Sequence, residues 1–210
     1  MEAKDLFSKC KFSETQLDAM RQIYYKHFSP HMMGPYAGRA IVAIWEKDGV
    51  WETTKGKDVN HNNTGFVSEE CRNDPLWQEF SDLLPYMSQT ASITKMPAGD
   101  VMIPHVDRKW RAEAIYFPIE GCSEKCISEY YDLPKIETEN NQVTQIFPEA
   151  THTYSIYGNA YLTNVHEWHG VRNLSNMERI AVGWNFKNPN MNYQYCRQIL
   201  GDLGYLEGQN

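Results

Sequence analysis

The sequence predicts a single α+β domain over residues 1–210 whose core is a β-sandwich or jelly roll. Two amphipathic helical patterns and polar loops occupy the N-terminal part, residues 1–88. About eight short strand patterns separated by tight turns follow over residues 89–187, as is typical of an all-β core. Residues 188–210 form a tail. No internal repeat or low-complexity linker divides these parts, so we expect one domain.

The first helical pattern covers residues 13–28. Ser13 begins it, and Gln16 follows three residues later, as in a capping box. Apolar residues then recur at helical spacing: Leu17, Met20, Ile23, Tyr24 and Phe28. We interpret this segment as a packing helix and expect His27 and His31, near its end, to be surface residues.

A strand, a loop and a second helix are predicted next. The strand covers residues 36–45. The loop covers residues 54–70, which are polar and rich in Asn and Gly, and loops of this length often act as lids or binding loops. Asp74 and Pro75 begin the second helix, because Pro is favoured at the first helical position. Its apolar stripe is expected to face the core: Leu76, Trp77, Phe80, Leu83 and Leu84.

The strands of the core follow in order. Residues 92–107 predict a hairpin in which PAGD forms the turn, and residues 113–119 predict a buried strand. Residues 151–165 predict a second hairpin around Gly158 and Asn159, because Gly-Asn is a favoured turn pair.

Three further segments complete the expected topology. Residues 120–150 are a polar excursion, in which SEYYD and QVTQIF are candidate edge strands, and this excursion is a second candidate lid. Residues 178–186, ERIAVGWNF, predict the last strand. Residues 193–200 predict a short helix.

Composition and charge exclude some classes of protein. The formal net charge of −7 argues against a nucleic-acid partner, whose phosphates favour basic surfaces. No apolar run is long enough to span a bilayer, and the first residues lack the apolar segment of a secretory signal, so we expect a cytoplasmic protein. The five cysteines are then expected to be reduced, and Cys122 and Cys126, spaced CxxxC without a second pair, are expected to be ordinary thiols.

A histidine and a carboxylate provide the main functional signal. His105 and Asp107 are separated by one residue, so their side chains project from the same face of an extended strand. His169, separated from Asp107 by 61 intervening residues, offers a third ligand. Two histidines and one carboxylate form the facial triad of non-haem Fe(II) oxygenases, which leaves other metal positions open. His166 and His152 are alternative third ligands, but we favour His169.

Arg179 follows His169 by ten residues, at the start of the last predicted strand. Alternation places Arg179 on one face with small residues, Ala181 and Gly183, and with Asn185. The other face is apolar and predicts core: Ile180, Val182, Trp184 and Phe186. An arginine on a face with room for a ligand can bind a carboxylate with two hydrogen bonds.

The HxD pair, the distal histidine in HGVRN and the later arginine resemble the Fe(II)/2-oxoglutarate-dependent oxygenases, and most closely their aspartyl/asparaginyl β-hydroxylase-like branch. The resemblance covers roughly residues 89–187. It implies a double-stranded β-helix, a jelly-roll and cupin-like fold. It also implies that His105, Asp107 and His169 bind the catalytic Fe(II).

The same resemblance implies how the cosubstrates bind. Arg179 would pair with the far carboxylate of 2-oxoglutarate, and Thr94 and Tyr116 would lie in strands that line this cosubstrate. O2 would take the remaining position. The expected reaction is hydroxylation of an unactivated C–H, with a free amino acid or an amino-acid side chain on a peptide as substrate.

Cations near the HxD pair are candidate substrate ligands. Arg111 is the one that we assign to an anionic substrate, whereas Arg108 and Lys109 fit a solvated charge run. Two other functions stay open at this point. One is a cupin-type metal enzyme that does not use 2-oxoglutarate, in which Arg179 would be structural. The other is a β-sandwich binding module without a metal.

Overall fold

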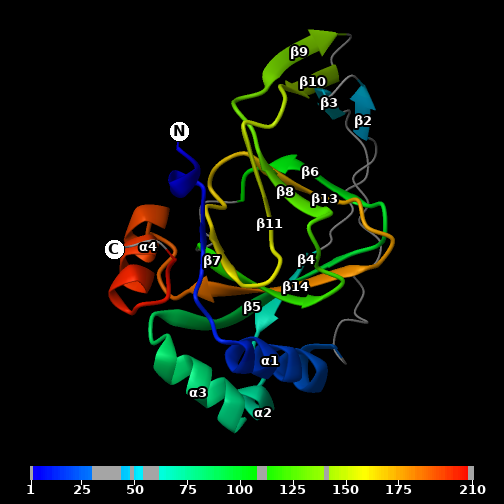
Figure 1. The fold of residues 1–210 in the computed structure, drawn as a ribbon. Coiled ribbons are helices and arrows are strands. Elements are labelled where there is room, and N and C mark those ends of the chain that lie inside the picture. Colours follow the sequence, from blue (N-terminus) through cyan, green and yellow to red (C-terminus); the bar gives the residue numbers. More distant parts are fainter. Residues whose placement is uncertain are drawn as a thin grey trace.

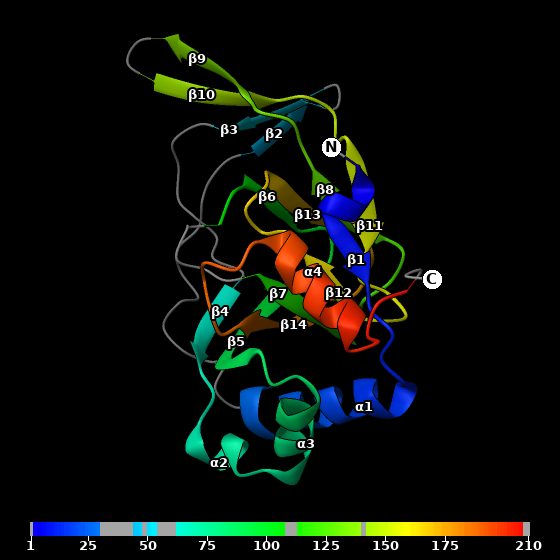
Figure 2. The ribbon, with the colours of Figure 1, turned by 90° about the vertical axis from the view of Figure 1, so that its left-hand side faces the viewer.

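The computed structural model describes residues 2–29, 44–47, 50–53, 62–107, 113–139 and 142–207. Two antiparallel sheets face each other in its centre (Figures 1 and 2). The larger sheet has the order β1-β12-β7-β14-β5-β4, with β1 (Phe7–Lys9), β12 (Tyr161–Thr163), β7 (Ala114–Glu120), β14 (Arg179–Phe186), β5 (Met87–Met96) and β4 (Asn62–Phe66). The smaller sheet has the order β11-β8-β13-β6, with β11 (His152–Ser155), β8 (Cys126–Tyr130), β13 (His169–Asn173) and β6 (Val101–His105).

Successive strands alternate between these two sheets. The chain passes from β5 in the larger sheet to β6 in the smaller one, back to β7, and on to β8. The second half repeats this pattern in reverse, since β11 and β13 lie in the smaller sheet and β12 and β14 in the larger one. The core is therefore a β-sandwich of the jelly-roll type, as the strand patterns predicted.

Both predicted hairpins are wrong. The turn that contains Gly99, at φ 75°, joins β5 to β6, and the turn that contains Gly158, at φ 72°, joins β11 to β12. Neither pair of strands is hydrogen-bonded, because β5 pairs with β14 and β4, whereas β6 pairs with β13. Turn residues specify a reversal of the chain, but they do not specify which strand becomes the partner.

A third sheet lies beyond the smaller one, at the top of Figure 1. Its order is β2-β3-β10-β9, with β2 (Ile44–Lys47), β3 (Val50–Thr53), β10 (Gln142–Phe147) and β9 (Lys135–Glu139). The two predicted edge strands of the 120–150 excursion are both interior. SEYYD overlaps β8, which lies between β11 and β13, and QVTQIF is β10, which lies between β3 and β9.

Two predictions near the N-terminus fall only partly on described residues. Most of the predicted strand at residues 36–45 lies outside them, and so do residues 54–61 of the predicted loop. The rest of that loop is structured, because β4 pairs with β5 and α2 (Glu69–Arg72) follows. His31 lies outside the described residues.

The predicted helices are confirmed with revised bounds. Ser13 caps α1 (Glu14–Ile23) in a capping box with Gln16, and one turn of π-helix, η2 (Tyr24–Phe28), extends it. Asp74 caps α3 (Pro75–Leu83), and α4 (Tyr193–Asp202) follows β14. A 3-10 turn, η1 (Ala3–Asp5), precedes β1.

His27 is buried, which corrects the surface prediction. Its side chain is 3% exposed, and its Nε2 lies 2.9 Å from Asp74 Oδ2. This contact ties the end of the first helix to the start of α3. His27 follows Ile23 by four residues and Met20 by seven, so it lies on the buried stripe of the helical segment.

The main apolar core lies between the helices and the larger sheet. In Figure 1, α1, α2 and α3 cover the face of this sheet that points away from the smaller one. The core residues there come from both layers, among them Leu17, Met20, Trp77, Phe80, Phe117, Val182 and Trp184. The opposite face of the larger sheet is left to face the smaller sheet. None of the helices in the described ranges combines the length and apolarity needed to cross a bilayer.

Candidate metal and anion site

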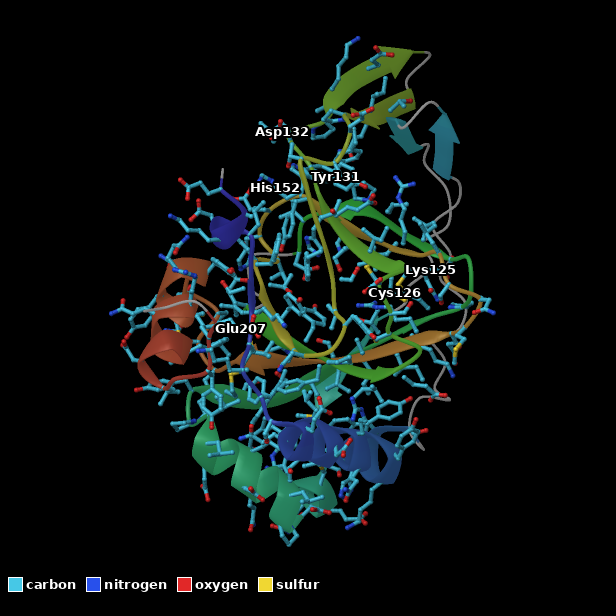
Figure 3. All side chains as sticks on the ribbon, in the orientation of Figure 1. Lys125, Cys126, Tyr131, Asp132, His152 and Glu207 are labelled. Atoms are coloured by element: carbon cyan, nitrogen blue, oxygen red, sulfur yellow. The ribbon has the colours of Figure 1, made fainter. Side chains whose placement is uncertain are left out.

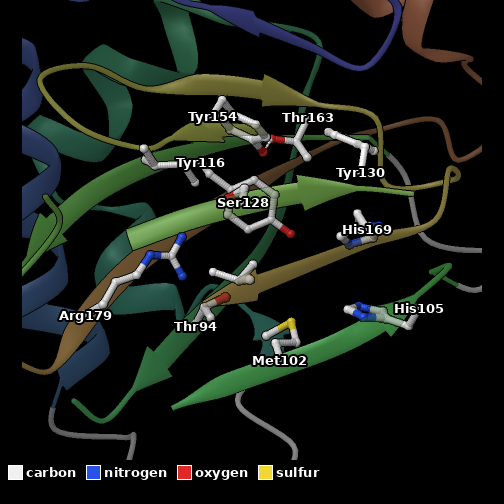
Figure 4. A pocket seen from close by; sticks show the side chains of 12 residues that line it. Thr94, Met102, His105, Tyr116, Ser128, Tyr130, Tyr154, Thr163, His169 and Arg179 are labelled. Carbon is white, nitrogen blue, oxygen red and sulfur yellow. Dashed lines mark hydrogen bonds between the residues drawn. The ribbon is translucent and has the colours of Figure 1, made fainter. Parts of the chain in front are cut away.

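A cavity lies between the two central sheets (Figure 4). The empty space within it is about 440 Å³, which includes the part open to solvent. The residues that line it are Thr94, Met102, His105, Tyr116, Ser128, Tyr130, Tyr154, Ile156, Thr163, His169, Val171 and Arg179. Five of the predicted site residues thus line one cavity: Thr94, His105, Tyr116, His169 and Arg179.

His105, Asp107 and His169 form the one group of metal-ligating side chains found among the described residues. One ligand atom from each lies within 4.8 Å of the others. His105 Nε2 is 3.6 Å from Asp107 Oδ1, and the two imidazole ring centroids are 4.4 Å apart. The spacing is close enough for one ion to contact all three atoms.

Strand pairing explains why these residues meet. His105 ends β6, His169 begins β13, and the antiparallel register places them directly opposite each other. Asp107 follows β6, and its backbone N–H donates to Val165 O at 3.0 Å. The two halves of the triad, separated by 61 intervening residues in sequence, are therefore joined by one pair of strands.

Backbone carbonyls fix the orientation of both imidazoles. His105 Nδ1 lies 2.7 Å from Ile103 O, and His169 Nδ1 lies 2.9 Å from Glu167 O. A carbonyl only accepts, so each Nδ1 carries the proton, and the lone pair of each neutral ring is on Nε2. This is the arrangement that metal-ligating histidines adopt. Two imidazole nitrogens and one carboxylate oxygen form a donor set that fits Fe(II) with positions left open.

Arg179 lies at the other end of the cavity. Figure 4 shows its guanidinium pointing into the space between the sheets, on whose far side the histidine pair lies. The residue is only 2% exposed. Nη1 contacts Met96 Sδ at 3.5 Å, and the buried Nε has no hydrogen-bond partner. No carboxylate in the described ranges forms an ion pair with this buried cation, and a buried charge without a counter-charge is costly.

The alternation predicted for β14 is confirmed. Its apolar face belongs to the main core, and its other face borders the cavity. Gly183 on the second face has a steric role, because an added Cβ would lie 2.8 Å from Tyr116 Cε1. Tyr116 is opposite Gly183 in the register of β7 and β14, so the absent side chain makes room for its ring.

Four hydroxyl residues of the cavity wall were not predicted: Ser128, Tyr130, Tyr154 and Thr163. The Tyr154 hydroxyl is 2.8 Å from Thr163 Oγ1, and the Tyr130 hydroxyl donates to Leu6 O at 2.7 Å. Burial raises the pKa of both tyrosines, so they remain neutral hydrogen-bonding groups. For Ser128, Tyr130 and Tyr154, the sequence signal is the alternation within SEYYD and THTYSIY, which are predicted as an edge strand and as part of a hairpin.

The alternative ligands lie apart from the triad. His166 Nε2 is 3.8 Å from Glu113 Oε1, and His152 Nδ1 is 3.2 Å from Thr151 Oγ1 at the start of β11 (Figure 3). Neither belongs to the metal-ligating group. Arg111, predicted to bind substrate, lies outside the described residues, as do Arg108 and Lys109.

The cysteines lie apart from the metal-ligating group. The cysteines are free thiols, and Cys126 Sγ contacts Gly121 O and Asn173 Oδ1. Cys122 Sγ contacts Ile180 O, and burial raises its pKa. The structure thus gives neither thiol a role in a metal site.

Comparisons with known proteins give only distant likenesses. No family model matches the chain, and no curated protein matches it. A crystal structure of an oxidoreductase of the 2OG-Fe(II) oxygenase family from Burkholderia pseudomallei has a TM-score of 0.37 and 11% identity, covering 88% of this chain and 82% of that one. An oxalate oxidase structure has a TM-score of 0.21 and 12% identity, covering 88% and 75%. Likenesses this weak carry no argument, so the functional conclusion depends on the site itself.

Proposed function

We propose that this protein is an Fe(II)- and 2-oxoglutarate-dependent dioxygenase that hydroxylates an unactivated C–H. One observation carries the proposal: both histidines of a two-histidine, one-carboxylate donor set line the same cavity as a buried arginine that has no carboxylate partner in the described ranges. A dicarboxylate with a 2-oxo acid at one end satisfies both, since one end chelates the metal and the other neutralises the arginine.

The strand order supports a finer description of the fold. Eight strands alternate between the two sheets, with orders β12-β7-β14-β5 and β11-β8-β13-β6. We infer a double-stranded β-helix, in which the metal ligands come from the neighbouring strands β6 and β13 of the smaller sheet and from the segment after β6, and the arginine comes from the larger sheet. The aspartyl/asparaginyl β-hydroxylase-like branch and a single oxygenase domain over residues 1–210 are part of the same proposal.

Each of the proposed site residues has a defined part in the reaction. His105, Asp107 and His169 hold Fe(II), and Arg179 binds the distal carboxylate of 2-oxoglutarate, with Thr94 and Tyr116 beside it. Bound iron supplies the activation of O2 that couples oxidation of 2-oxoglutarate to succinate and CO2 with hydroxylation of the substrate. The neutral tyrosine and threonine hydroxyls orient the cosubstrate without adding charge, and the two sheets exclude water from it.

The proposed substrate is an amino acid or an amino-acid side chain on a peptide. Arg111 is proposed to bind an anionic group of it, near the HxD pair in sequence. A small-molecule or peptide partner, rather than nucleic acid, is proposed because the net charge is −7. A cytoplasmic location is part of the same proposal.

Anaerobic titration tests the proposal. Fe(II) and then 2-oxoglutarate are added to the apoprotein, and the weak visible metal-to-ligand charge-transfer band is recorded. We expect the band in the wild type, its loss in His169→Ala, and its appearance only at much higher 2-oxoglutarate in Arg179→Ala. Arg21→Ala is the control, because Arg21 lies on α1 and pairs there with Asp18.

The alternatives give different results. A cupin-type enzyme that does not use 2-oxoglutarate binds Fe(II) tightly but gives no band, and its activity survives Arg179→Ala. A metal-free binding module takes up neither iron nor cosubstrate, and His105→Ala then changes only its stability. Binding of neither iron nor 2-oxoglutarate would therefore contradict the enzyme proposal altogether.

A further inference from the structure

The loop that connects β12 to β13, residues 164–168, contacts two of the three proposed ligands through its backbone. Val165 O accepts from the backbone N–H of Asp107 at 3.0 Å. Glu167 O accepts from His169 Nδ1 at 2.9 Å. A shift of this loop would therefore move a carboxylate and an imidazole together.

A buried carboxylate holds the middle of this loop. Glu113, directly before β7, is 1% exposed, and its Oε2 accepts from the Val165 N–H at 3.0 Å. Its own carbonyl accepts from Phe186 N at 2.9 Å, so the residue is anchored to the larger sheet. A hydrogen bond to a carboxylate is about twice as strong as a neutral one, and burial strengthens it further. Val165 thus connects Glu113 on its N–H side with Asp107 on its carbonyl side.

Asn164 holds the start of the loop from the opposite side. Its Oδ1 accepts from His166 N at 3.2 Å, and its Nδ2 donates to Asp5 O at 3.1 Å. Its backbone N–H donates to Leu6 O at 2.8 Å. These bonds tie the loop to the N-terminal segment, so its position is set from two directions.

We propose that Glu113 is a positioning residue for the metal site, acting through the loop of residues 164–168, with Asn164 as its second anchor. Neither residue is a metal ligand. The inference rests on the proposed metal site and adds to it the groups that preorganise Asp107 and His169. Groups that orient metal ligands typically change metal affinity by about 10–100-fold when they are removed.

The affinity of the full chain for a metal ion tests this positioning role without requiring catalytic activity. Mn(II) is titrated into the apoprotein, and free Mn(II) is followed by electron paramagnetic resonance. We expect Glu113→Ala to weaken Mn(II) binding by about tenfold or more, whereas Glu113→Gln, which keeps an oxygen acceptor for the Val165 N–H, stays within about threefold of the wild type. A loss in Glu113→Gln as large as in Glu113→Ala would overturn positioning by this hydrogen bond in favour of a direct charge effect on the ion.

Asp74→Ala is the matched control, because Asp74 is also a buried carboxylate that accepts from a backbone N–H, that of Leu76. It lies at the start of α3 and contacts no residue of the loop or the triad. We expect Asp74→Ala to lower the unfolding temperature and to leave Mn(II) affinity unchanged. If Glu113→Ala behaves in the same way, its role is structural only and the inference is wrong.

Asn164→Ala keeps the inference testable if Glu113→Ala does not fold. Asn164 is only partly buried, so its loss threatens the fold less, and we expect a several-fold weaker Mn(II) affinity. An unchanged affinity would overturn the role of the loop. A wild-type protein that binds neither Mn(II) nor Fe(II) would instead remove the proposed function, which is a different result from unchanged affinity in the variants.

Discussion

The two faces of the larger sheet use the same strands for different purposes. On β14, Trp184 and its apolar neighbours pack against α1 and α3, whereas Arg179 lines the cavity and Gly183 lies against the ring of Tyr116, which also lines it. On β7, Phe117 faces the helices and the adjacent Tyr116 faces the cavity. One residue step along a strand therefore separates a side chain that stabilises the fold from one that meets a ligand.

Unpaired polar groups on the cavity face lower the stability of the fold, and apolar burial on the helix face offsets this loss. Arg179 Nε and Asn185 Oδ1 are buried without a hydrogen-bond partner, and such groups cost about 1–3 kcal/mol each. The described residues of β7 and β14 that face the helices carry no charge, and their large apolar side chains contribute about 1.5–3 kcal/mol each on burial. Substitutions on the two faces should therefore separate ligand binding from stability.

Replacement of His169 has the largest expected effect. In His169→Ala, loss of a ligand weakens metal binding by more than the roughly 100-fold seen for supporting groups. The unfolding free energy of the apoprotein changes little, because His169 is only partly buried. Mn(II) titration and thermal unfolding in the presence of a chelator measure the two quantities. Wild-type affinity in the variant would exclude His169 from the site.

Arg179→Met comes second. Removing one partner of a buried ion pair costs about 3–5 kcal/mol, so the KM for 2-oxoglutarate should rise by about 150–5000-fold. The apoprotein should be as stable as the wild type or more so, because an apolar side chain replaces a buried charge. Steady-state kinetics measures the KM, and urea unfolding measures the stability. A lower stability with an unchanged KM would mean that Arg179 has a structural role and does not bind 2-oxoglutarate.

Phe117→Ala tests the other face of the same sheet. Phe117 is fully buried and contacts Phe12 and Phe80, with ring centroids 5.0 and 5.9 Å away, so its loss should cost about 3–5 kcal/mol of unfolding free energy. The KM for 2-oxoglutarate should not change in the folded variant. Tyr116→Phe is the matched change one residue away, for which we expect the opposite: near-native stability and a raised KM.

These two faces also show what the sequence could predict. The alternation along residues 178–186 correctly separates the core residues from Arg179, because a strand has a fixed period of two. The spacing of His105 and Asp107 predicts a shared face for the same reason, and the structure brings both to His169. Local periodicity is therefore enough to predict which side chains of a single strand share a face.

Strand partners and long-range contacts could not be predicted in this way. The turns at Gly99 and Gly158 are recognisable, but the two strands that each turn joins enter opposite sheets. With the wrong partners for the edge strand at SEYYD and for the hairpin at residues 151–165, the roles of four residues in the cavity wall could not be predicted: Ser128, Tyr130, Tyr154 and Thr163. Glu113 gives no signal either, since its contact with Val165 N depends on the placement of residues 52 positions apart.

Gly183→Ala has a smaller expected effect, on the cavity side. The new Cβ would lie 2.8 Å from the edge of the Tyr116 ring, and the ring must turn into the cavity to relieve the contact. Overpacking of this kind costs about 1–3 kcal/mol. We expect a lower unfolding free energy together with a several-fold higher KM for 2-oxoglutarate. Because Tyr116 is the group displaced, Gly183→Ala combined with Tyr116→Ala should recover the stability, and failure to do so would mean that the ring is not the obstacle.

The smallest expected effect is on the helix side, where Asp74 caps α3. Hydrogen bonds from Lys26 and then His27 lower the pKa of this carboxyl well below its usual range. Its contribution to stability is therefore present above the unfolded-state pKa of about 3.9 and is lost as pH falls through the lower folded-state value. We expect Asp74→Ala to cost about 1–2 kcal/mol near pH 7, mainly through the lost cap, and the difference from wild type to shrink at acid pH. Urea unfolding of both proteins at neutral and acid pH measures it. A difference that grows as the solution is acidified would mean that Asp74 is protonated in the folded protein, and a change in the KM for 2-oxoglutarate would mean that the helix layer and the cavity are not independent.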